Sequence, residues 1–299
     1  MQINSLTLTY VAKVSMASLN GADKEVDNIN PIKKVTLSNG ETLPYVSSQA
    51  IRRALRDRLI EMGWEASPIG DRDKEKSASA TAGLPDRYIE DDLFGYMTTA
   101  SKSVAVTRSS PIRVESLVGL DTYKGDLDFG TNYMGKSVGA NPNIFETEIH
   151  SGFYRGTILI ELDRVGEFNI LEGNDLENVN EEEKAKRVIA FIQAFQNLWS
   201  SGRQTRFLAD ISPKFVAAAL MKAKNPVFLE GVKVDAEGAL NYPEIQSIAS
   251  DYSDYIDKHV FASQAATFSL EEGMVSLKEG FNTIAAWVRE YYGLEKQPG

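Results

Sequence analysis

The amino-acid sequence predicts an α+β protein whose elements follow the order of a β-α-β-β-α-β, ferredoxin-like core with insertions. The chain opens with an alternating apolar segment at 3–16, which is typical of a strand. Apolar residues recur at helical spacing in two later segments, 48–62 and 181–200, and strand-like runs lie between them. Of the 299 residues, 42% are hydrophobic, so the chain can bury one sizeable core. We therefore expect one domain that carries insertions.

The first third of the chain contains the clearest signals. One face of the opening strand is apolar, which predicts a half-buried strand, and it comprises Leu6, Leu8, Tyr10, Ala12, Val14 and Met16. Residues 35–44 predict a hairpin that turns at Asn39-Gly40. Ser47-Ser48 then predicts the start of a helix, because serine is a good N-cap. Arg52, Arg53, Arg56 and Arg58 fall on the other faces of that helix.

The middle of the chain predicts interrupted strands around a long insertion. Residues 104–108 are strand-like, Ser110-Pro111 interrupts them, and 112–120 resumes the strand, so we expect an edge or a bulge there. The stretch 121–149 is rich in Gly, Asn, Asp and Tyr and is too long for a plain connection, which indicates a functional or disordered segment. A strand at 154–165 follows. The helix at 181–200 opens with three glutamates, which suit the positive end of the helix dipole.

The last third predicts mainly helices. We expect a helix at 213–224, a strand at 227–234 and two late helices at 244–260 and 271–292. Ser269 and Glu272 have the spacing of a capping box for the last helix. Trp199 and Trp287 lie on apolar helix faces and are predicted to belong to the core.

The composition argues against the common enzyme classes. The chain has no cysteine and only two histidines, His150 and His259, so a thiolate or histidine-rich metal site is excluded. No nucleophile elbow, phosphate-binding loop or zinc-protease motif occurs. No apolar run is long enough to span a bilayer, and the first residues lack the pattern of a signal peptide. We expect a cytoplasmic protein without a membrane partner, cofactor or metal.

The charge is acidic overall but unevenly distributed. The net charge of -10 argues against nucleic-acid binding at first sight. However, residues 200–225 hold five Lys/Arg against one Asp/Glu, whereas residues 161–183 hold one against nine. An acidic protein with basic islands can hold a phosphate backbone locally. The alternative is that these islands are ordinary solvated faces.

Six short segments occur in a fixed order over about two thirds of the chain. They are the opening strand with Asn20-Gly21 and 28–33; 43–53, the most specific stretch; 92–96; 108–113 with 125–130; 150–156; and 202–210. Each is weak alone. Taken in this order, they resemble the DevR group of CRISPR-associated, RAMP-type backbone subunits of type I Cascade complexes, with a type I-B-like complex as the expected context.

The resemblance implies a modified RRM-like palm, an inserted helical finger region at about 63–100, a thumb-like hairpin at about 121–150 and C-terminal helices at about 244–292. It implies a non-catalytic subunit that stacks head to tail with copies of itself along guide CRISPR RNA. The bases would be left to pair with a target DNA strand. Further partners would be the large subunit, the small subunit and the subunits that cap the guide ends.

Two segments are the main candidates for phosphate binding. Ser47, Ser48 and Gln49 offer hydroxyl, amide and backbone N–H groups at a helix start, and Arg52 and Arg53 could add charge. The alternative is that the serines only cap the helix and the arginines are solvated. The second segment resembles the family's glycine-arginine loop, unless it is an ordinary turn; it comprises Gly202, Arg203, Gln204 and Arg206.

Further RNA contacts are expected where strands end or bend, at Asn20, Lys24, Arg108 and Ser109. Tyr133 and Met134, flanked by glycines, are candidates for a wedge that stacks on a base. Alternatively, that loop folds its aromatic side chains inward. His150 could bond to RNA, but a structural role is the favoured interpretation.

Two other functions stay open. Related type III backbone subunits cut RNA with an aspartate in a loop after the first strand. Asp23 and Asp27 lie in such a loop here. A metal-dependent endoribonuclease is therefore the alternative function. The DevR name itself suggests a transcriptional autoregulator, although no helix-turn-helix is evident.

Overall fold

The structure is a computed structural model that describes residues 2–23, 28–69, 81–101, 104–133, 139, 143–168, 176–200 and 206–294. Several predicted site residues lie outside the described residues, namely Lys24, Asp27, Met134, Gly202, Arg203 and Gln204.

The centre of the molecule is an antiparallel sheet in which β1 (Ser5–Ala17) lies between β10 (Asn143–Glu161) and β11 (Phe215–Met221). The far side of β10 pairs with β7 (Ile112–Val114) and β8 (Leu117–Gly119). Helix α1 (Ser48–Glu61) lies in the chain between β1 and β7, and α3 (Glu181–Gln196) lies between β10 and β11. This order is the predicted β-α-β-β-α-β core, and the α+β fold class is confirmed.

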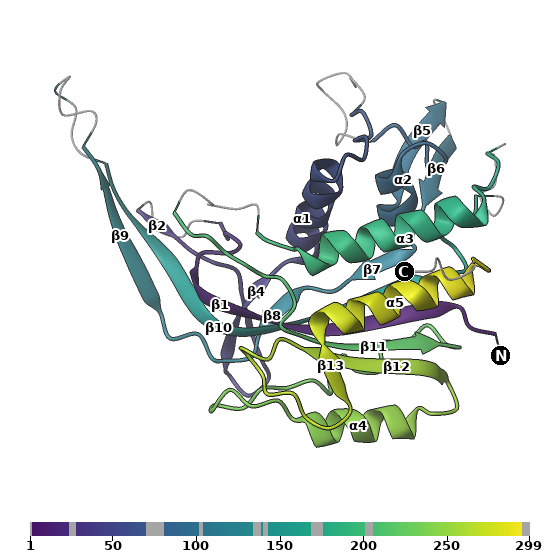
Figure 1. The fold of residues 1–299 in the computed structure, drawn as a ribbon. Coiled ribbons are helices and arrows are strands. Elements are labelled where there is room, and N and C mark those ends of the chain that lie inside the picture. The colour runs from purple at the N-terminus through teal and green to yellow at the C-terminus, as the bar shows by residue number, and fades with distance from the viewer. Residues whose placement is uncertain are drawn as a thin grey trace.

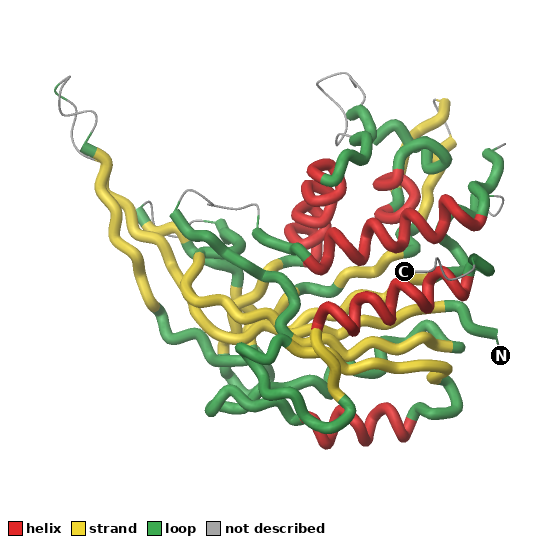
Figure 2. The backbone as a smooth tube through the Cα atoms, in the orientation of Figure 1, coloured by secondary structure: helices red, strands yellow, loops and turns green. Residues whose placement is uncertain are grey.

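Additional strands extend this core on both sides (Figure 2). Beyond β11 lie β12 (Ile256–Ser263) and β13 (Met274–Ser276), and beyond β8 lie β4 (Thr42–Val46) and β3 (Lys34–Thr36). The short β2 (Ile29–Asn30) and β9 (Asp126–Asn132) also pair with β10. A separate two-stranded sheet consists of β5 (Tyr96–Ser101) and β6 (Val104–Arg108), next to α2 (Ile89–Phe94).

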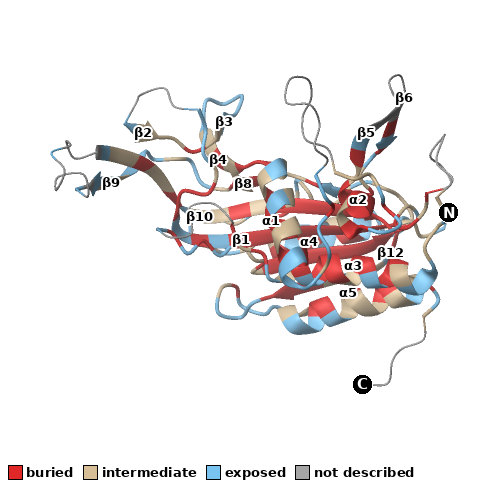
Figure 3. Ribbon diagram, turned by 90° about the horizontal axis from the view of Figure 1, so that it is seen from above, coloured by how far each residue is buried: buried red, intermediate tan, exposed pale blue. Residues whose placement is uncertain are grey.

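Both faces of the central sheet are covered. Figure 1 shows α1, α3 and α5 (Leu277–Tyr291) on one side and α4 (Tyr242–Asp251) on the other. The first side packs on Leu6, Leu8 and Tyr10 of β1, and the second packs on Val11 and the odd-numbered residues of β11. β1 is therefore buried on both faces as far as Ala12 (Figure 3), so the prediction of a half-buried strand was wrong. Met16, predicted for the apolar face, is 53% exposed because β1 has a bulge at that point.

A hairpin projects from one end of the sheet. It consists of β9 and the first part of β10, paired from Asp126↔Ile149 to Asn132↔Asn143. The stretch 121–149, expected to be functional or disordered, therefore contains regular strands. The assignment of this hairpin as a thumb, and of 63–100 as a finger, stays a prediction.

The C-terminal third corrects four sequence-based predictions. Residues 213–224 contain the strand β11 instead of a helix, because their alanine-rich run is buried on both faces. Residues 227–234 form turns instead of a strand, and residues 244–260 divide into α4 and β12. The last helix is capped by Ser276, whose side chain accepts a hydrogen bond from the amide of Glu279 at 3.3 Å, and Ser269 is not the cap.

Among the described helices, none is both long enough and apolar enough to cross a membrane.

Candidate nucleic-acid interface

The start of α1 is fixed to the ends of two strands. Ser47 is the N-cap, as predicted, and its side chain accepts a hydrogen bond from the amide of Ala50 at 3.4 Å. The amide of Ser47 donates to the side-chain oxygen of Asn20 at 2.9 Å, and the amide of Ser48 donates to the hydroxyl of Ser116 at 3.1 Å. Asn20 and the helix start are thus brought together. The backbone amides of Ser47, Ser48 and Ala50 therefore already have hydrogen-bond acceptors. A phosphate at this helix start would contact side chains before these amides.

A hollow of about 210 Å³ lies where these segments meet. Its walls come from the residues just after β1, the first half of α1 and the segment that follows α3, and they include Asn20, Ala50, Arg53 and Ser200. Ser200 directly precedes the predicted glycine-arginine segment. Asn20 and the start of α1, which the sequence indicates separately, therefore converge on one place together with Ser200, although they are far apart in the chain.

The two predicted arginines of α1 have different environments. The side chain of Arg53 is 72% exposed and forms an ion pair with Asp57 at 2.9 Å, one turn further along the helix. Arg52 is half-buried: it donates to the backbone oxygen of Phe94 and lies over the ring of that residue at 5.4 Å. Burial and the neighbouring charge of Arg56 lower the pKa of Arg52. Arg53 is therefore the better placed of the two for a solvent-borne phosphate.

Arg206 lies against the base of the hairpin. Its guanidinium forms an ion pair with Asp128 and donates to the hydroxyl of Thr147 at 3.2 Å. It also lies 5.0 Å from the ring centre of Phe145. Its side chain remains 34% exposed. The last residue of the predicted segment 202–206 therefore packs against the hairpin.

Besides Tyr133, the hairpin exposes apolar side chains that were not among the residues predicted from the sequence. Tyr133, a predicted wedge residue, is 58% exposed just beyond the last strand pair. Leu127, Phe129 and Ile144 are also exposed, and Phe129 is 61% exposed. The pairs Leu127↔Glu148, Phe129↔Glu146 and Thr131↔Ile144 place these three on one face of the hairpin. The alternation in Asp126-Leu127-Asp128-Phe129 was the available signal.

Arg108 is built into the fold and does not reach this interface. It is 3% exposed, and its guanidinium donates to the carboxylate of Asp92 at 2.5 Å and to the backbone oxygens of Asp92, Arg164 and Glu167. The hydroxyl of Ser109 accepts from Arg164 at 2.7 Å. Arg164 follows the end of β10, whereas Asn20 lies beyond the opposite end of that strand's partner β1. The burial of Arg108 argues against the RNA contact expected of it, and local sequence does not show its buried carboxylate partner. Ser109 is exposed, and its expected contact with RNA stays a prediction.

His150 has a structural environment. It is 8% exposed, and its Nδ1 shares a hydrogen bond of 2.8 Å with the hydroxyl of Tyr154. Burial lowers its pKa, and the charges of Asp121 and Asp126 partly oppose this. Trp287 is buried, as predicted, and Trp199 is half-buried beneath the guanidinium of Arg58 at 3.6 Å.

The chain was compared with known families and structures. It matches the family model described as CRISPR-associated negative auto-regulator DevR/Csa2 over residues 8–236. No curated protein sequence matches it. Two solved structures have the same fold. One is a chain of a "CRISPR RNA-guided surveillance complex, pre-nicking", with a TM-score of 0.64 and 15% identity over 95% of this chain and 100% of that chain. The other is a chain of a "CRISPR RNA-guided surveillance complex", with a TM-score of 0.60 and 17% identity over 95% of this chain and 99% of that chain.

The family match covers well over half of the chain and includes the described hollow, the hairpin and Arg206. The chain belongs to the DevR/Csa2 family of CRISPR-associated proteins.

Proposed function

We propose that this protein is a non-catalytic backbone subunit of a CRISPR RNA-guided complex, and that it holds guide RNA at the junction of α1, the end of β1 and the hairpin. The observation that carries the proposal is the convergence of Asn20, Arg53 and Ser200 on one hollow. Side chains that bind phosphate from several elements fix a nucleic-acid backbone without reading its sequence.

The covered sheet supports this location. In an RRM, aromatic side chains on the open face of the four-stranded sheet stack on bases. Here that face is covered by the layer that contains α4, which packs Phe228, Tyr242 and Ile245 against β11 and β12. RNA therefore has access to the end of the sheet and the hairpin, but not to the sheet face.

The hairpin supports a repeating arrangement on RNA. Its exposed Leu127, Phe129 and Tyr133 provide apolar and aromatic surfaces that can stack on bases or enter between them. A neighbouring copy bound head to tail would place one such hairpin at each repeat along the guide. The remaining bases would stay available to pair with a target DNA strand, while the other subunits of a Cascade complex would bind the ends and sides of the filament.

The proposal is tested by purifying the protein from cells that express a CRISPR array and the partner subunits, and by sequencing any RNA that co-purifies. We expect guide-length RNA in a large particle that loses RNA as salt is raised. A monomer free of nucleic acid, obtained with the partner subunits present, would contradict the proposal.

The same preparation separates the alternatives. Cleavage of target RNA that requires a divalent metal and is lost on Asp23→Asn would favour an endoribonuclease. Tight binding to duplex DNA without RNA would favour an autoregulator, the role named in the family description.

A further inference from the structure

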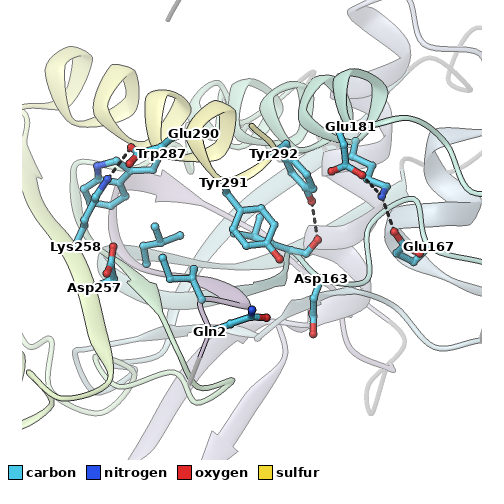
Figure 4. A pocket seen from close by; sticks show the side chains of 14 residues that line it. Gln2, Asp163, Glu167, Glu181, Asp257, Lys258, Trp287, Glu290, Tyr291 and Tyr292 are labelled. Atoms are coloured by element: carbon cyan, nitrogen blue, oxygen red, sulfur yellow. Dashed lines mark hydrogen bonds and ion pairs between the residues drawn. The ribbon is translucent and has the colours of Figure 1, made fainter. Parts of the chain in front are cut away.

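A groove of about 580 Å³ opens at the end of the sheet opposite the hairpin. Figure 4 shows that it lies between the last turns of α5, the start of the chain and the turn that follows β10. β12 borders it through Asp257 and Lys258. The proposed RNA interface lies at the other end of β1 and β10, so the groove is a separate surface.

The groove is acidic, and its own cations are already neutralised. Its lining carboxylates outnumber its lysines, and they are Asp163, Glu167, Glu181, Asp257 and Glu290. Lys184 pairs with Glu167 at 2.5 Å and with Glu181 at 2.6 Å, and Lys258 pairs with Glu290 at 2.6 Å. Asp257 is exposed and has no ion pair within the described part of the chain. Asp163 also pairs at 2.7 Å with Lys224, which does not line the groove. The five lining carboxylates outnumber these three lysines, so the groove presents net negative charge to whatever enters it.

Aromatic side chains form the α5 wall. Trp287 and Tyr291 both line the groove (Figure 4). Burial, and to a lesser extent the charges of Asp163, Glu181 and Glu167, raise the pKa of Tyr291 to about 12. Aromatic rings flanked by carboxylates attract lysine and arginine side chains through cation–π and ionic contacts. Phosphates would be repelled, so a nucleic acid is the wrong class of ligand.

An open strand edge lies beside the groove. β13 pairs only with Phe261–Ser263 of β12, and across residues 256–260 no other described strand lies on the side away from β11. A bulge opposite Leu220 and Met221 places Asp257 at this edge, where it also lines a second hollow towards α4. Charged residues and bulges on an edge discourage pairing with apolar strands. They leave pairing possible for a segment of opposite charge.

We propose that an extended, lysine- or arginine-bearing segment of a partner protein binds along the open edge of β12 and places its cations in the acidic groove. The backbone of the segment would pair with β12, and its alternate side chains would reach Asp257 and the aromatic wall. This proposal concerns a surface that the RNA interface does not use, and it does not rest on the proposed function.

The first test uses the full chain and a fluorescein-labelled nine-residue peptide in which lysine alternates with valine or threonine. A second peptide carries glutamate in place of each lysine. We expect the lysine peptide to bind in a salt-sensitive manner and the glutamate peptide not to bind. Equal binding of the two peptides overturns the proposal, and so does the absence of binding by the lysine peptide.

The second test locates the binding. Asp257→Asn removes a charge with no ion pair to break, so the fold is retained, and we expect about threefold weaker binding of the lysine peptide. Glu244→Gln, on the exposed face of α4, makes the same change in net charge outside the groove and is the matched control. Equal effects of the two variants would show a general charge effect and would overturn the proposal.

The third test examines the pairing and the occupant. N-methylation of alternate backbone amides in the lysine peptide is expected to abolish binding, and unchanged binding overturns the strand-pairing geometry. Self-association of the pure chain that is lost on Asp257→Asn would identify a second copy as the occupant, which overturns a partner protein. Retention of guide RNA is expected to be unchanged in Asp257→Asn, so failure here is distinguishable from failure of the proposed function.

Discussion

Two groups of arginines in this molecule have opposite surroundings. Near α2, Arg108 and Arg187 converge on Asp92, whose carboxylate is fully buried and accepts from them at 2.5 Å and 2.8 Å. Near the start of α1 and the hairpin, Arg53 and Arg206 keep exposed guanidinium surface and have one carboxylate partner each, Asp57 and Asp128. The first group holds the fold together, and the second lies at the proposed interface.

The difference shows that burial and partners, rather than residue type, decide what an arginine does. Arg187 also donates to the backbone oxygens of Pro85 and Asp86, so all sides of the first group are occupied by protein. A buried charge without its partner is very unfavourable, whereas an exposed pair contributes little to stability. Changes in the first group should therefore act on stability, and changes in the second on RNA binding.

The largest expected effect is at Asp92. Asp92→Asn would leave the buried guanidinium of Arg108 without its carboxylate partner and Arg187 with Glu183 alone, and we expect the free energy of unfolding to fall by about 3–5 kcal/mol. Chemical denaturation followed by circular dichroism measures this. The matched control is Asp128→Asn, which breaks the more exposed pair with Arg206 and should cost at most about 1 kcal/mol. Similar losses in the two variants would contradict the comparison.

A smaller effect on stability, with a defined pH dependence, is expected at Glu161. Burial alone would raise the pKa of this carboxylate, but the hydrogen bond from Lys224 and the charges of Arg164, Lys224 and Arg113 hold its pKa below the usual range. Because the folded state has the lower pKa, the stabilisation is present above the unfolded value and is lost as pH falls through the folded value.

Glu161→Gln should therefore lower the free energy of unfolding by about 1.5–3 kcal/mol at neutral pH. The two stability curves should converge as the pH is lowered below the unfolded pKa of glutamate, about 4.3. Denaturation at a series of pH values checks this. A difference that stays constant down to acid pH would show that the charge of Glu161 is not its source.

At the hairpin, the expected effect is on RNA and not on the fold. Phe129 is 61% exposed, so Phe129→Ala should leave the thermal midpoint almost unchanged. If its ring stacks on a base, RNA binding should weaken by about 1–3 kcal/mol per base. Leu270→Ala removes a similarly exposed apolar side chain from the C-terminal region and is the control. Equal RNA affinity for both variants would show that Phe129 does not contact RNA.

Local patterns in the sequence were sufficient for much of the fold. Serine capping and helical spacing located α1, and the alternation of 3–16 located β1. They failed at β11 because alanine has high helix propensity, and burial on both faces of a sheet overrode that preference. They failed at Arg108 because its partner Asp92 is 16 residues away and fully buried.

The site was only partly predictable for the same reason. The sequence indicated Asn20, Ser47 and Arg53 separately, from strand-end and helix-start signals. The hydrogen bond from Ser47 to Asn20 spans 27 residues and exists only after β1 and α1 have packed. Which of the two adjacent arginines faces the hollow depends on where Phe94 lies, and no local pattern contains that information.

The finest distinction is therefore between the neighbours Arg53 and Arg52. Arg53→Gln should remove about one unit from the slope of log affinity for guide RNA against log salt, the change expected for one lost phosphate contact, with stability unchanged. Arg52→Gln is the matched control; because Arg52 donates to the backbone of Phe94, it should lower stability while leaving the salt slope intact. RNA binding measured at several salt concentrations decides between them. If Arg52→Gln changes the slope and Arg53→Gln does not, the exposure of an arginine in this structure does not indicate whether it contacts phosphate. The assignment of Arg53 to the RNA interface would then be wrong.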